Sequence, residues 1–126
     1  MSIDEMREHY KNAGNYYTAA NNASNAQTRS FYQQAGEAEH IKAYEAAEKA
    51  KQDVSTQACR EAKEYYDKSQ EAYEKGDMKA YQEYREQGDK IMSDAKEKEK
   101  EIKNEEEKAE SETLSKMGDL QRGRYH

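Results

Sequence analysis

Apolar residues recur at steps of three and four along most of the chain, the spacing of one face of an α-helix. The pattern resumes after a polar run at 21–28 and meets no strong helix breaker between Gly36 and Gly76. It leaves open whether 28–75 is one helix or two, and a bend is most expected at 53–57. The first row comprises Ile3, Met6, Tyr10, Ala13, Tyr17 and Ala20.

Gly76 and Asp77 form the clearest turn signal, because glycine is favoured just after a helix and aspartate at the start of the next. Beyond this turn two rows of residues, each with a spacing of seven, are predicted to face the neighbouring helix. The shorter, companion row contains Tyr84 and Ile91 and ends where Lys98 takes the next position. The seam, meaning the contact between this helix and its neighbour, is therefore predicted to be packed to about residue 95 and solvated after it. The main row recurs every seven residues, at Tyr81, Gly88, Ala95, Ile102 and Ala109.

Two stretches of the chain echo each other. NYYTAANNA at 15–23 aligns with EYYDKSQEA at 64–72, and YQQAG at 32–36 aligns with YREQG at 84–88. Each copy has paired tyrosines, an alanine, a turn, a tyrosine and a glycine. This order suggests two helical hairpins in tandem.

The segment 72–88 also resembles the helical hairpin found ahead of Smr nuclease domains and, more loosely, a tetratricopeptide hairpin. The resemblance lies in the sequence AYEKGD and in the distance between Gly76 and Gly88. The alanine expected five residues after the first glycine comes four residues after it, at Ala80. The resemblance implies a hairpin and carries over no function.

These patterns predict an all-α fold, in which tandem α-helical hairpins form an elongated helical bundle or antiparallel coiled coil with a charged C-terminal helix. We expect a helical hairpin or bundle domain at 1–95, a charged helical extension at 96–112 and a flexible tail at 113–126. If the repeat is real, the expected helices are about 3–24, 28–51, 54–75 and 78–110.

Core-forming residues are scarce. Leu, Ile, Val and Phe together number eight, whereas there are 17 alanines and 11 tyrosines. Alanine buries little area, and a tyrosine hydroxyl needs water or a partner. A monomer should therefore be marginally stable, and association is a way to complete its core.

Charge and composition favour a cytoplasmic protein. The 21 basic and 27 acidic residues are interspersed, with a net charge of −6, so neither nucleic acid nor membrane is an expected partner. The single cysteine, Cys59, cannot form an internal disulfide, which fits a reducing compartment. No secretion signal or membrane span is predicted.

Candidate chemistry is sparse. Glu37 and His40 have the Glu-x-x-His spacing of di-iron bundles, but such a centre needs a second pair and two further glutamates. Cys59 follows Ala58 and is expected to be a small buried filler. We expect no catalytic residue, no cofactor and no metal, hence no enzyme. A metal-dependent bundle using Glu37 and His40 is the least favoured alternative.

The tyrosines give three alternatives: a core made of tyrosine, a protein-binding surface or, least favoured, a surface that stacks on a ligand or a base. In each adjacent pair one ring should enter the seam while the other points outward. We predict a non-enzymatic protein–protein interaction or oligomerisation module, with a protein partner or, preferably, a homo-oligomer. The alternative is a small acidic phage or mobile-element inhibitor or accessory protein that masks a basic surface with glutamates of 97–107. The candidate interface residues are Tyr16, Tyr17, Tyr65, Tyr66, Tyr73, Tyr81, Tyr84 and Ile91.

Overall fold

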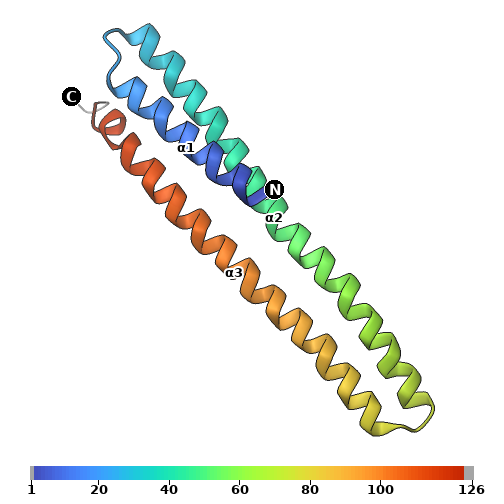
Figure 1. Cartoon of the computed structure of the whole chain (residues 1–126). Coiled ribbons are helices and arrows are strands. Elements are labelled where there is room, and N and C mark those ends of the chain that lie inside the picture. Colours follow the sequence, from blue (N-terminus) through green and yellow to red (C-terminus); the bar gives the residue numbers. More distant parts are fainter. Residues whose placement is uncertain (1, 124–126) are drawn as a thin grey trace. The chain divides into compact units, whose positions relative to one another are not determined.

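The chain folds into three helices, as a computed structural model shows (Figure 1). The structure describes the backbone of residues 2–123 and the side chains of 3–118. Helix α1 is Ser2–Asn21, α2 is Ala26–Glu74 and α3 is Met78–Gly123, with no strand in the described backbone. The all-helical bundle predicted from the sequence is confirmed.

Helix α2 is continuous, so 28–75 lies within one helix rather than two. The four-helix arrangement that the repeat would imply is therefore wrong, and the chain has one helix over 28–74. The helix is not interrupted at 53–57, because this segment contains neither Gly nor Pro. Its Val, Ser and Thr each lower helix propensity by less than about 0.7 kcal/mol relative to alanine.

Local chemistry fixes both connections. Asn25 Oδ1 accepts a hydrogen bond of 2.8 Å from the Thr28 amide, so Asn25 is the N-cap of α2. At the other end Gly76 has a φ of 77°, and the Asp77 amide donates to Ala72 O at 2.9 Å. This is a Schellman ending, as the Gly76–Asp77 signal predicted.

The helices contribute to two compact units. Unit 1 consists of 1–50 and 102–126, and unit 2 of 51–101. These divisions differ from the predicted boundaries after residues 95 and 112. They differ because α3 packs in unit 1 well beyond residue 95.

Unit 1 is built from α1, the start of α2 and the end of α3, which lie side by side in Figure 1. One cluster joins Met6 and Tyr10 of α1 to three alanines of α2, Ala43, Ala46 and Ala47, with Ala109 of α3 packed against it. A second cluster contains Ala13, Tyr17 and Ala20, with Tyr32 and Met117 against it. Alanines on α2 bring the helices close, so larger side chains of α1 fill the interior.

The second half of α3 is not the solvated extension predicted for 96–112. Ile102 and Glu106 are 8% and 9% exposed, and Thr113 is 3% exposed. The helix also continues to Gly123, so the flexible tail predicted from 113 is wrong for 113–123. Residues 124–126 lie outside the described backbone.

Unit 2 is an antiparallel hairpin of 51–74 from α2 and 78–101 from α3. All its buried residues are small, namely Ala58, Ala62, Ser69, Ala72, Gly88 and Ala95. The predicted row of residues seven apart thus packs at Gly88 and Ala95. The larger side chains of unit 2 lie at partly or fully exposed positions.

Candidate functional site

A tyrosine ring packs on a glycine in both units. In unit 1 a Cβ at Gly36 would lie 2.6 Å from Tyr17 Cε1, and in unit 2 a Cβ at Gly88 would lie 2.7 Å from Tyr66 Cε1. Only glycine leaves room for rings this close to the backbone of the facing helix. These four residues occupy equivalent places in the two echoing stretches, so both stretches make the same contact between a ring and a glycine.

An acidic residue follows each of the two glycines. Tyr66 Oη donates a hydrogen bond of 2.6 Å to Asp89 Oδ1. In unit 1, burial and then the negative charge of Glu37 raise the pKa of Tyr17. The echo between the two stretches was recognised by its tyrosines and glycines, and this acidic position was missed. The dipeptides Gly36-Glu37 and Gly88-Asp89 could have revealed it.

The other tyrosine of each pair lies on an outer face of its unit. The Tyr16 and Tyr32 rings stack with their centroids 6.3 Å apart. At the equivalent place in unit 2, Lys68 Nζ lies 5.5 Å from the Tyr65 ring centroid and 5.9 Å from that of Tyr84. A cation over two rings is a favourable arrangement that keeps this face partly wet.

The outer face of unit 2, which we call the tyrosine face, extends beyond these rings. A shallow groove of about 190 Å³ includes Val54 and Ile91 among its lining residues. The tyrosine face comprises Val54, Tyr65, Tyr84 and Ile91, all partly exposed. Tyr73 and Tyr81, whose ring centroids are 5.4 Å apart, lie on the other side of the hairpin with Tyr66, because Arg85 bonds to Tyr81 and lies near the Tyr66–Asp89 pair.

The structure separates the eight predicted interface residues. Tyr17 is fully buried, so its assignment to an interface is wrong. Tyr66, the equivalent residue of unit 2, stays half-exposed, because no third helix covers it as α3 covers Tyr17. Tyr16 is 36% exposed, as expected for the outward ring of its pair. The remaining six lie in unit 2: Tyr65, Tyr66, Tyr73, Tyr81, Tyr84 and Ile91.

Sequence reasoning missed a second exposed apolar surface, in unit 1. Ile41 and Tyr44 have the three- and four-residue spacing of a buried helix face but are 60% and 56% exposed. The seam of α2 instead follows Gly36, Ala43 and Ala50, which are seven residues apart and buried. That row of small residues is the signal that could have placed Ile41 and Tyr44 outside.

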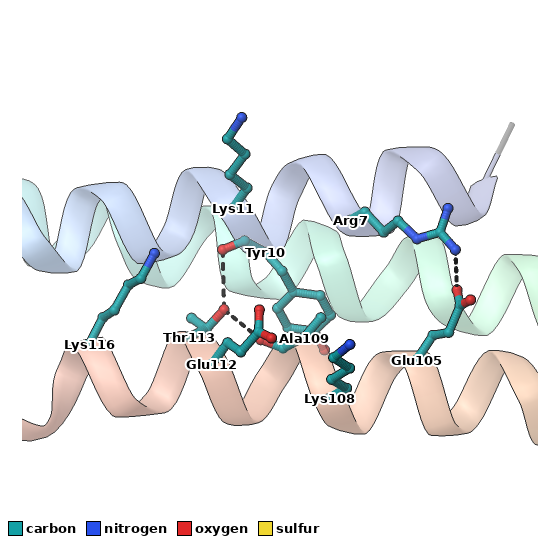
Figure 2. Close-up of a pocket in the computed structure, with 9 residues that line it drawn as sticks. All are labelled: Arg7, Tyr10, Lys11, Glu105, Lys108, Ala109, Glu112, Thr113 and Lys116. Carbon is teal, nitrogen blue, oxygen red and sulfur yellow. Dashed lines mark hydrogen bonds and ion pairs between the residues drawn. The ribbon is translucent and has the colours of Figure 1, made fainter.

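A third surface is the polar groove between α1 and α3 in unit 1 (Figure 2). Arg7 pairs with Glu105 at 2.5 Å, and Thr113 Oγ1 lies 3.2 Å from Tyr10 O. Lysines and glutamates alternate along its α3 side, as Figure 2 shows. Four basic and two acidic residues line the groove, and its ion pair and hydrogen bond join α1 to α3.

The residues considered for chemistry make ordinary contacts between helices. His40 Nε2 lies 3.6 Å from Glu110 Oε1, and His9 Nδ1 lies 2.5 Å from Glu39 Oε2. Among the described side chains, no three or more His, Cys, Asp or Glu residues are arranged to hold a metal ion. Cys59 is exposed, so its expected role as a buried filler is wrong.

Comparison of the chain with protein-family models, curated proteins and solved structures finds no match. None of the helices, within the part of the chain that is described, is both long and apolar enough to cross a membrane.

Proposed function

We propose that the chain is a non-enzymatic helical module that associates with a second copy of itself through the tyrosine face of unit 2. One observation carries this proposal. Every buried residue between 51 and 101 is Ala, Ser or Gly, while the large apolar side chains of that unit remain in contact with water. A hairpin whose core contains only small side chains buries little apolar area, so covering its larger side chains would add substantially to its stability.

The chemistry of the tyrosine face supports protein binding. Tyrosine is enriched at protein interfaces because its rigid ring provides area while its hydroxyl tolerates water. Pairing two hairpins face to face gives a four-helix bundle, a common way to bury two such seams.

The charges around the tyrosine face support a second copy as the partner. The groove at Val54 and Ile91 is lined by two acidic residues, Glu61 and Asp94, and by one basic residue, Lys98. Because both signs are present, two identical faces can approach in a register that pairs opposite charges.

Sedimentation equilibrium of the full chain over about three decades of concentration tests this proposal. We expect a dimer or higher species for the natural sequence, and a shift to monomer in Ile91→Lys. Ile41→Lys is the matched control, because it places the same charge at an exposed isoleucine of unit 1. A monomer throughout, or equal effects of the two substitutions, contradicts the proposal.

A further inference from the structure

An open groove lies between α2 and the end of α3 in unit 1. Its volume is about 530 Å³, and its apolar walls are Ile41 and Tyr44 of α2 and Leu114 and Met117 of α3. Ile41, Tyr44 and Leu114 are 60%, 56% and 43% exposed. In a chain with eight Leu, Ile, Val and Phe residues, two of them line this one groove at exposed positions.

The walls have the geometry that receives a helix. Ile41 and Tyr44 are three residues apart on one helix, and Leu114 and Met117 are three apart on the other. Residues at this spacing share a helix face, so each wall presents two neighbouring anchors. A helix lying between them would become the fourth member of the three-helix unit.

The floor of the groove is already built. Tyr17 reaches it from α1, is fully buried and is held against Gly36. An occupant would therefore meet a preformed surface, which lowers the entropic cost of binding.

The electrostatics of the groove select the occupant. Glu37 lines it, and no Lys or Arg is among its lining residues. His40, also in the lining, lies 3.6 Å from Glu110 of α3. A second copy seated groove to groove would bring Glu37 against like charges, which is unfavourable. A partner with cationic flanks would be attracted.

We infer that this α2–α3 groove binds an amphipathic helix of a partner protein whose apolar stripe is flanked by Lys and Arg. The inference goes beyond the proposed self-association, because it uses a different unit and different residues. It also suggests how an acidic protein could mask a basic target, using the glutamates beside this groove in place of those at 97–107.

A synthetic helical peptide of about 18 residues tests the inference. The probe has leucine at steps of three and four and Lys or Arg elsewhere, and carries a fluorescent label. The control probe has Glu in place of every Lys and Arg. Binding to the full chain is followed by fluorescence anisotropy at several salt concentrations.

We expect the basic probe to bind with one-to-one stoichiometry and the acidic probe not to bind. Ile41→Lys should weaken binding by about tenfold or more, as loss of an interface anchor does. Glu37→Gln should weaken it less and reduce its dependence on salt. Phe31→Lys is the matched control, because Phe31 is 67% exposed and does not line the groove.

Three outcomes would overturn the inference: no binding of the basic probe, equal binding of both probes, or equal loss in Phe31→Lys and Ile41→Lys. The last would mean diffuse attraction to an acidic protein. Repeating the titration in an Ile91→Lys background separates this result from the self-association test, since the groove should bind whether or not unit 2 associates. Circular dichroism confirms that each variant remains helical.

Discussion

At the scale of the residue, both units have a contact between a tyrosine ring and a glycine, but the two rings differ in how far they can move. Tyr17 is fully buried on Gly36, whereas Tyr66 on Gly88 is half-exposed. A ring at the surface can move away from an added methyl group. A ring enclosed by other side chains cannot do so without disturbing its neighbours.

Gly36→Ala should therefore destabilise the protein and Gly88→Ala should not. Alanine gains about 1 kcal/mol of helix propensity at either site. Overpacking against Tyr17 costs about 1–3 kcal/mol, so the first change should lower the free energy of unfolding by up to about 2 kcal/mol. Urea unfolding followed by circular dichroism measures both variants. Gly118→Ala, where nothing lies within 4 Å of the new Cβ, is the control. Stabilisation of Gly36→Ala to the level of this control would contradict the account.

Tyr10 should make the protein sensitive to alkaline pH. Burial, then the charges of Glu106 and Glu110, raise the pKa of its hydroxyl in the folded state. A raised folded pKa contributes stability below the unfolded value of about 10, and that contribution is lost as the pH rises further. The free energy of unfolding should thus fall above about pH 10 less steeply in Tyr10→Phe than in the natural chain.

Urea unfolding at pH 7 to 11, with tyrosinate absorbance on the same samples, tests this expectation. Tyr73→Phe is the control, since Tyr73 is 55% exposed. Identical slopes in Tyr10→Phe and Tyr73→Phe would show that Tyr10 is not responsible.

At the scale of the element, the sequence predicted which segments are helical. It predicted the packed positions of α3 only in the first half of that helix. The Gly76 turn and the packing of Gly88 and Ala95 followed from turn chemistry and from the seven-residue spacing. The companion row failed at Lys98 because it moves by one residue there: half-buried Glu99, buried Glu106 and buried Thr113 continue it. Such a shift in register keeps a helix in contact although the strict seven-residue pattern is lost.

Ile102 tests whether the second half of α3 is truly packed. Ile102→Ala should lower the free energy of unfolding by about 2 kcal/mol or more, because the side chain is 8% exposed. Ile41→Ala, the same substitution at a 60% exposed position, should change it by less than about 0.5 kcal/mol. Thermal and urea unfolding measure both variants. Equal effects would mean that α3 is solvated beyond residue 95.

At the scale of the whole molecule, the two units solve the shortage of core residues differently. Unit 1 covers Tyr17 with a third helix, while unit 2 leaves its tyrosines half-exposed. The sequence could identify the tyrosines as a candidate surface, because paired tyrosines on a helix must point in two directions. It could not show that Tyr17 is covered, because the cover comes from a segment about 100 residues away whose seam had shifted register. Nor could the sequence place Ile41 and Tyr44 at the surface, because they have the same helical spacing as the alanines of α2 that are buried.

The central claim is that unit 2 completes its core by association while unit 1 does so within one chain. Amide hydrogen exchange of the full chain, measured at low and high protein concentration, tests it residue by residue. We predict that protection of helix amides within 51–101 rises with concentration, while protection at the core of unit 1 stays constant. Protection independent of concentration throughout the chain, or a rise confined to unit 1, would contradict the account.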